Sequence, residues 1–339
     1  MTKFSTAPRH TFLIICLIAC FALTCFTRAH SLRAQAVLNQ QPVELQLAVR
    51  PPFRFIAYGD TRFTNPGNTE ASNAAVRRTL VKAIADEHPA FICIGGDISY
   101  NGDDANDWKV WDAETSIWRE KKIPVYPALG NHDLHGDQKV ALGSYFQHFP
   151  ELGDSRYYSV AAANTLLLVL DSSLDETSGA QGQWLRHKLE AIPAGVDFVF
   201  VVLHHPPYTS SSDQKKYGGG HSGRSSEHML AEMLENYQQK MEARIIVFAS
   251  HVHNYERHQH GGITYFVTGG GGAHAYPIER ASNDIFRDTH INYHYLLVEV
   301  DRKAARITMN RLDLTHGAPA WTQPDSVQIA GAASASASR

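Results

Sequence analysis

Cysteine is scarce in this sequence, and its distribution excludes two kinds of structure. Of the four cysteines in 339 residues, Cys16, Cys20 and Cys25 lie in the N-terminal segment. Cys93 is the one that follows, and it sits inside an apolar run. A single thiol forms neither a disulfide framework nor a thiolate metal site, so neither is expected to hold the folded domain together.

The sequence also lacks a large excess of one charge. Its net charge is -3 at pH 7, whereas a dedicated nucleic-acid-binding domain shows a basic stripe, so no such surface is expected. No segment repeats at a solenoid period. A hydrophobic content of 43% supports a sizeable core, in one large α/β domain or two smaller ones. No heptad pattern indicates an oligomeric state, which stays open.

The N-terminal residues have the pattern of a targeting segment. Lys3 and Arg9 precede an apolar run over 12–26, and small residues follow at 34–36. This order predicts a signal peptide over residues 1–36 and export to a periplasm or the outside. The apolar run is shorter than the roughly 20 residues that a membrane-spanning helix needs. Anchoring as a lipoprotein through Cys20 is the alternative, and membrane contact is expected only if the segment is retained or lipidated.

Apolar runs alternate with amphipathic segments through most of the chain, which predicts an α/β fold with mostly parallel strands. The predicted strands are 54–58, 90–94, 124–129, 198–203 and 244–249, with helices at 72–86, 181–191 and 226–239. Antiparallel pairs are expected at 156–160 with 165–170 and at 295–300 with 305–312. Residues 37–318 are predicted to form one domain, and 319–339 a disordered tail.

Metal-ligating side chains follow the ends of these strands. In chain order they are Asp60, Asp97 with Tyr100, Asn131, His204, and His251 with His253. Because parallel strands end at one edge of a sheet, we expect these side chains to meet there. Carboxylate and amide oxygens and imidazole nitrogens are common metal ligands. The sequence therefore predicts a metal centre. Asp171, which follows another strand, is expected to brace a neighbouring loop.

Five short blocks resemble the calcineurin-like metallophosphoesterase superfamily, and within it the purple acid phosphatases most closely. They are Gly59-Asp60, Gly96-Asp97-Ile98-Ser99-Tyr100, Gly130-Asn131-His132-Asp133, Val201-Val202-Leu203-His204 and His251-Val252-His253-Asn254-Tyr255-Glu256-Arg257. The resemblance spans roughly residues 54–300. It implies a four-layer α/β/β/α sandwich with two mixed sheets.

The resemblance also implies a role for each residue. Asp97 would bridge two metal ions, with Asp60, Tyr100 and His253 on the first ion and Asn131, His204 and His251 on the second. His132 would contact the phosphoryl group or leaving oxygen, and Asp133 would orient His132. Arg62, His205 and His221 are candidate substrate contacts. Two such ions, about 3.5–4 Å apart, bind the attacking and leaving oxygens of an in-line displacement.

Two positions depart from the superfamily pattern. Arg62 stands where many members have His, and Tyr100 is placed to replace that ligand. This exchange implies Fe as the first ion, with Fe, Zn or Mn as the second. Arg62 itself either binds phosphate as a bidentate donor or pairs with an acid at the surface. Ser250 replaces a usual Gly, from which we expect only a slight backbone adjustment.

The predicted function is hydrolysis of small phosphate monoesters by a metal-bound hydroxide in an exported enzyme. The alternatives are a phosphodiesterase or cyclic-nucleotide hydrolase using the same site, and a non-catalytic protein that binds metal or phosphate. The polar loop over 209–226, with glycines at 218–220, is expected to form a mobile flap over the site.

Overall fold

The computed structural model describes residues 42–314 and 318–332. The description below concerns the compact unit that begins at Val43. The predicted signal peptide, residues 1–36, lies outside the described residues, and export therefore stays a prediction. Within the described ranges, no helix combines the length and apolar character needed to cross a membrane.

One mixed sheet contains seven strands in the order β1-β5-β6-β7-β8-β10-β9. Parallel pairing joins β6 to β7, β7 to β8 and β8 to β10, while β5 and β9 run antiparallel to their neighbours β6 and β10. The strands are β1 Glu44–Leu47, β5 Tyr158–Ala162, β6 Thr165–Val169, β7 Phe198–Val202, β8 Arg244–Ala249, β9 Tyr255–His260 and β10 Ile263–Thr268.

A second mixed sheet follows the order β13-β12-β11-β2-β3-β4, and β14 also pairs with β12. Its parallel part is β2-β3-β4, and the strands from β11 onward run antiparallel. The strands are β2 Phe53–Tyr58, β3 Ile92–Ile94, β4 Val125–Pro127, β11 Tyr293–Val300, β12 Ala304–Asp313, β13 Ala320–Thr322 and β14 Ser326–Ala330. Together the sheets confirm the predicted fold class.

Alternating side chains of the strands form the layers of the core. On β7, Phe200 belongs to the cluster between the sheets, where its ring lies 5.0 Å from that of Phe55 on β2. The next residue, Val201, faces the other way, into a second cluster with side chains of α6 and α7. Because strand side chains alternate in direction, these all-apolar strands are buried on both faces.

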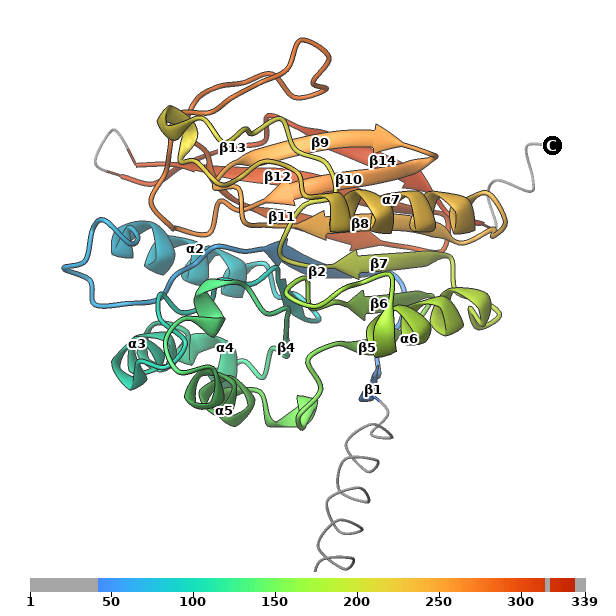
Figure 1. The fold of residues 1–339 in the computed structure, drawn as a ribbon, viewed down its shortest axis with the longest axis horizontal. Helices are drawn as coiled ribbons and strands as arrows, with labels where there is room; N and C mark the ends of the chain where they lie inside the picture. Colours follow the sequence, from blue (N-terminus) through green and yellow to red (C-terminus); the bar gives the residue numbers. More distant parts are fainter. Residues whose placement is uncertain (1–41, 315–317, 333–339) are drawn as a thin grey trace, which may run out of the picture. The chain divides into compact units, whose positions relative to one another are not determined.

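Helices cover the outer faces (Figure 1), with α2–α5 grouped near β2 and β4, and with α6 and α7 beside β6–β8. They are α2 Ala74–Asp86, α3 Ala105–Glu114, α4 Ser116–Glu120, α5 Gln138–His148, α6 Gly179–Glu190 and α7 Ser225–Gln238. Three short 3-10 turns complete the described elements: η1 His132–Leu134, η2 Pro150–Leu152 and η3 Lys215–Tyr217.

The prediction of a disordered tail over 319–339 was wrong for its described part. β13 and β14 both pair with β12, and the turn between them places Asp325 against β9. Asp325 accepts hydrogen bonds from Tyr255 Oη at 2.6 Å and from Arg257 Nε at 2.7 Å. Residues 333–339 lie outside the described part of the chain. The Ala/Ser-rich composition begins only at Ala330, and the prediction overlooked the strand Ser326–Ala330 before it, in which half-buried and exposed residues alternate.

Smaller predictions were also corrected or confirmed. The helix predicted from residue 72 begins at Ala74, and Asn73 caps it, because its side chain accepts hydrogen bonds from Ala75 N and Val76 N. Ser72 donates to the Arg62 carbonyl. Asp171 braces its neighbourhood as predicted, since its carboxylate accepts from Arg156 Nε at 2.6 Å and from Ser173 N at 2.9 Å.

Candidate metal centre

The predicted ligands lie at the carboxyl ends of strands from both sheets. Asp60, Asp97 and Asn131 follow β2, β3 and β4 of one sheet, whereas His204 follows β7 and both His251 and His253 follow β8 of the other. Glycines allow these ends to pack closely. A Cβ at Gly59 or at Gly95 would lie 2.1 Å from Ser250 Oγ, so Ser250 fits between the two sheets only because both neighbours are glycine.

Four potential metal-ligand atoms converge at His204 Nε2, which is one of them, and we call these four donor atoms the second group. Asn131 Oδ1 lies 3.0 Å, His251 Nδ1 3.2 Å and Asp97 Oδ1 3.4 Å from His204 Nε2. Ligands about 2.0–2.2 Å from one ion stand about this far apart. The neutral His204 ring carries its proton on Nδ1, which contacts the Gly95 carbonyl, so Nε2 has a lone pair. Its contacts with Asn131 Oδ1 and Asp97 Oδ1 therefore join acceptor atoms, which fits a shared cation.

The first group consists of Asp60, Asp97 and His253. Their ligand atoms lie within 4.8 Å of one another, and all three residues are buried. Asp60 Oδ1 and His253 Nε2, 3.7 Å apart, are both buried, and neither has a hydrogen-bond partner among the described residues. Leaving such atoms unpaired costs free energy, so the first group also has the properties of a cation site.

Each imidazole of the two groups is oriented through its other nitrogen. His204 Nδ1 donates to the Gly95 carbonyl at 2.8 Å, and His253 Nδ1 donates to the His274 carbonyl at 2.6 Å. His251 Nε2 lies 3.3 Å from the Gly220 carbonyl. These contacts leave one lone pair on each ring directed into the centre, which is the outer-shell arrangement typical of metal-binding histidines.

Burial favours the neutral form of these rings. The pKa values of the two carboxylates, Asp60 and Asp97, shift in opposite directions. Burial lowers the pKa of His204, His251 and His253. Burial and the neighbouring Asp97 raise the pKa of Asp60 well above its usual value. For Asp97, burial opposes ionisation, but the Arg62 guanidinium and the backbone N–H of His132 outweigh it and hold the pKa well below its usual value. Asp97 is thus the anionic centre that both groups share.

His132 lies beside Asp97, and its backbone N–H donates to Asp97 Oδ1 at 2.9 Å. Its Nδ1 lies 2.7 Å from the Tyr100 carbonyl, so Nε2 is the nitrogen left for a substrate. Burial lowers the pKa of His132 to about 4. In the neutral ring Nε2 therefore carries a lone pair, and His132 can donate from this atom only after it takes up a proton.

Asp133 does not orient the His132 ring, and that prediction was wrong. Its carboxylate accepts from the backbone N–H groups of Ile98, Ser99 and Gly130 at 2.9–3.0 Å. Asp133 therefore joins the loop after β3 to the loop after β4. The Tyr100 carbonyl holds the ring instead, a contact that residue type does not encode because any residue offers a carbonyl.

The ring of Tyr100 packs against His132. The two rings stack with centroids 5.2 Å apart, in addition to the carbonyl contact. Its role as a ligand of the first group stays a prediction.

The three candidate substrate contacts all lie at the centre. Arg62 is 7% exposed and donates to Asp97 Oδ2 from Nε at 3.1 Å and from Nη2 at 3.0 Å, so its pairing with a surface acid was a wrong alternative. His205 lies beside the ligands of the second group, since one of its ring nitrogens and the ligand atoms of His204 and His251 all lie within 4.8 Å of one another. His221, from the predicted flap, has its ring 4.9 Å from that of His251.

Tyr276 also lies at the centre, although it was not among the predicted site residues. Its ring stacks on His253 with centroids 5.1 Å apart and lies 5.5 Å from His221. A signal was available, because the strand before it, β10, runs parallel to β8 and so ends at the same edge. The loop after β10 could have been included on that ground.

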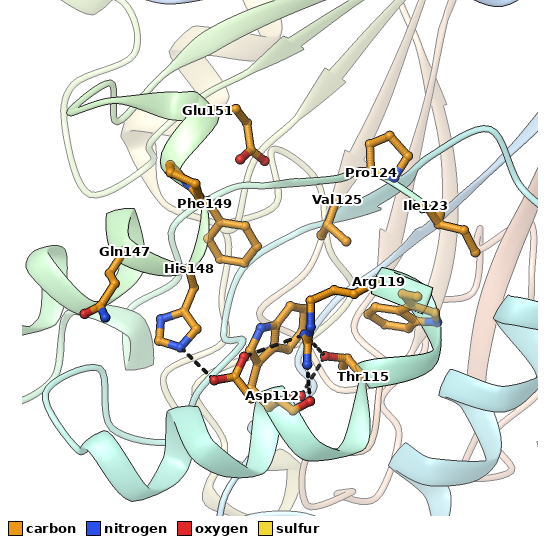
Figure 2. Close-up of a pocket in the computed structure, with 13 residues that line it drawn as sticks. Asp112, Thr115, Arg119, Ile123, Pro124, Val125, Gln147, His148, Phe149 and Glu151 are labelled. Atoms are coloured by element: carbon orange, nitrogen blue, oxygen red, sulfur yellow. Dashed lines mark hydrogen bonds and ion pairs between the residues drawn. The ribbon is translucent and has the colours of Figure 1, made fainter. Parts of the chain in front are cut away.

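A pocket of about 470 Å³ lies apart from the centre. Figure 2 shows the residues that line it. It lies at the start of β4, whereas Asn131 follows the end of that strand. Asp112 in its wall pairs with His148 at 3.4 Å and with Arg119 at 3.6 Å. None of the predicted site residues lines it, so the pocket gives no reason to move the candidate site.

A comparison with family models matches residues 53–255 to the calcineurin-like phosphoesterase family. A curated relative, the probable purple acid phosphatase 20 of Arabidopsis thaliana, is 29% identical over 221 residues, which cover 61% of this chain and 46% of the relative. The chain therefore spans about half the length of such curated relatives.

Two solved structures share the fold at low sequence identity. A purple acid phosphatase from seeds of yellow lupin, Lupinus luteus, has a TM-score of 0.62 at 18% identity and covers 83% of this chain and 54% of its own. GAP50, the anchor in the inner membrane complex of Plasmodium, has a TM-score of 0.56 at 17% identity and covers 80% and 88%. Because proteins so different in role share this fold, function must be argued from the donor atoms.

Proposed function

Because the chain belongs to the calcineurin-like phosphoesterase family, we propose that it is a metal-dependent phosphoric ester hydrolase, and specifically a phosphatase that acts on small phosphate monoesters. The observation that carries the proposal is the convergence of two donor groups on one shared carboxylate, Asp97. A binding protein that had lost catalysis would have no need to retain both groups together with a free His132 Nε2.

Two ions in these groups would lower the pKa of bound water, and so supply the nucleophile, and would neutralise the phosphoryl oxygens. The chain's own residues do the remaining work. Asp97 links the groups, and the carbonyl contacts fix the orientation of each imidazole. His132 contacts the phosphoryl group or the leaving oxygen through Nε2. Arg62, His205 and His221 contact the phosphate from the surrounding wall.

The metal content is part of the proposal. Tyr100 would bind the first ion as a hard phenolate, which favours Fe there, with Fe, Zn or Mn in the second group. Export is proposed on the N-terminal pattern alone, either as a secreted or periplasmic protein or as a lipoprotein held at a membrane. The substrate preference has its support in the resemblance to purple acid phosphatases.

The test compares 4-nitrophenyl phosphate with bis(4-nitrophenyl) phosphate on the metal-loaded full chain. A monoesterase hydrolyses the first with a kcat/KM at least about tenfold higher, a difference of about 1.4 kcal/mol in transition-state stabilisation. The opposite preference would identify a phosphodiesterase. Binding of two ions without turnover of either ester would identify a non-catalytic protein. Asp112→Asn, in the separate pocket, is the matched control and should leave both rates unchanged.

A further inference from the structure

Arg62 lies where the first group needs an open carboxylate oxygen. Asp97 Oδ1 faces the second group, 3.4 Å from His204 Nε2. This leaves Asp97 Oδ2 for the first group, and it is Oδ2 that accepts both Arg62 hydrogen bonds, from Nε at 3.1 Å and from Nη2 at 3.0 Å. A permanently charged guanidinium therefore uses the oxygen that a cation beside Asp60 and His253 would need.

The backbone of Arg62 is fixed in this place. Its φ is +44°, and Asp60 and Asp97 also have positive φ, at +56° and +53°. Residues other than glycine rarely adopt this backbone conformation, so the surrounding contacts must impose it. Arg62 N donates to the Asp97 carbonyl at 2.8 Å, and the Arg62 carbonyl accepts from Ser72 Oγ at 2.8 Å. Only the torsions of the side chain remain available to move the guanidinium.

The second group is built differently. The partners of His204 Nε2 are an amide oxygen, a second imidazole and Asp97 Oδ1. These donors are neutral or anionic, and their orientation is held by backbone carbonyls. An ion entering there meets lone pairs already directed at it, whereas an ion entering the first group meets a like charge on its shared ligand.

We propose that Arg62 competes with the metal ion of the first group for Asp97 Oδ2. The second group therefore binds its ion before the first group does, and Arg62 sets the affinity of the first group for its ion. Binding of the first ion displaces the guanidinium from Oδ2 by rotation of its side chain. The released side chain then lies at the mouth of the centre and is free to bind the phosphate of the substrate. This inference rests on the two-ion centre of the proposed function.

The test is calorimetric titration of the chelator-treated full chain with Co²⁺, together with the visible spectrum of the bound ion. Wild-type protein should bind two equivalents of Co²⁺, and the second equivalent should bind at least about tenfold more weakly than the one before it. Arg62→Gln removes the charge and retains a hydrogen-bond donor, and it should strengthen the weaker event by about tenfold or more while leaving the tighter one unchanged. Arg62→Lys keeps the charge and should keep most of the difference.

A matched control is Arg54→Ala, which removes an exposed arginine that pairs with Glu87 at 3.3 Å, away from the centre. It should leave both binding events unchanged. Thermal unfolding of each variant with and without Co²⁺ checks folding, and Arg62→Gln should be destabilised mainly without metal, because Asp97 is then a buried charge that has lost its partner.

Two results would contradict the inference in different ways. Two equivalents bound by every variant, with the weaker affinity unchanged or reduced in Arg62→Gln, would show that Arg62 does not compete, and would leave the two-ion centre intact. A single equivalent bound by wild type and by both Arg62 variants would overturn the two-ion centre itself, and the inference with it.

Discussion

The two donor groups share Asp97 and differ in what else contacts their donor atoms. In the second group, two neutral ligand atoms, Asn131 Oδ1 and His251 Nδ1, lie 3.0 Å and 3.2 Å from His204 Nε2. In the first group, Asp60 Oδ1 and His253 Nε2 have no hydrogen-bond partner in the described part of the chain, and the Arg62 guanidinium is bonded to the shared carboxylate. One group is arranged for an ion in advance, whereas the other exchanges a guanidinium for an ion.

This difference shows how one charged side chain changes the surroundings of half of the centre. Arg62 stands at a turn that the fold holds in place, and it sets a positive charge beside the carboxylate that both groups share. Apart from the shared Asp97, the ligands of the second group come from other loops, and within the described part of the chain none of them is hydrogen-bonded to that guanidinium. The predictions below test how far the two groups behave as separate units.

The largest effect is expected from Asp97→Asn, because it removes the one ligand that both groups use. We expect the hydrolysis of 4-nitrophenyl phosphate to fall by about a thousandfold or more, with loss of at least one ion. Steady-state kinetics and elemental metal analysis of the purified variant measure the two effects. Retention of both ions and of a tenth of the activity would show that Asp97 is not a bridge.

Single histidine variants should separate the groups. His204→Ala should remove the ion of the second group, and His253→Ala the ion of the first, each lowering the metal content from two per chain to one. Activity should fall by about a hundredfold or more in both variants. Metal analysis after dialysis at equal free metal gives the stoichiometry. If either variant loses both ions, the groups do not load independently.

Tyrosine variants test the identity of the first ion. With ferric iron bound, a phenolate ligand gives the purified protein a visible charge-transfer band. Tyr100→Phe should abolish this band, whereas Tyr276→Phe, which stacks on His253, should keep it. Absorption spectra of the iron-loaded proteins distinguish them. Loss of the band in Tyr276→Phe alone would transfer the ligand role to Tyr276.

A smaller effect is expected outside the centre, where Asp325 joins the C-terminal strands to the strand that follows His253. Asp325→Asn weakens the bonds from Tyr255 and Arg257, and we expect it to lower the free energy of unfolding by about 1–3 kcal/mol. Thermal unfolding measures the loss. Asp86→Asn, which weakens an exposed pair with Lys82, is the control and should leave the unfolding temperature nearly unchanged.

Most ligands of the centre were predictable, because their positions depend on local sequence patterns. Buried parallel strands are continuous apolar runs, so their ends and the ligands after them can be located without knowing how the strands pair. Asp60, Asp97, Asn131, His204, His251 and His253 were found in this way, and the structure brings them together. Tyr276 was missed because a glycine-rich segment separates it from the end of β10.

Residue type and strand order thus suffice to locate the donor atoms and to choose their chemistry, since both follow from side chains at fixed distances along the chain. The partners of those donors come from distant segments. The contact of Arg62 with Asp97 Oδ2, of Asp133 with three backbone N–H groups, and of Asp325 with β9 each depend on how two loops or sheets pack. Such contacts arise only when the folded chain excludes water, because a buried polar group must then bond to the groups that the fold places beside it.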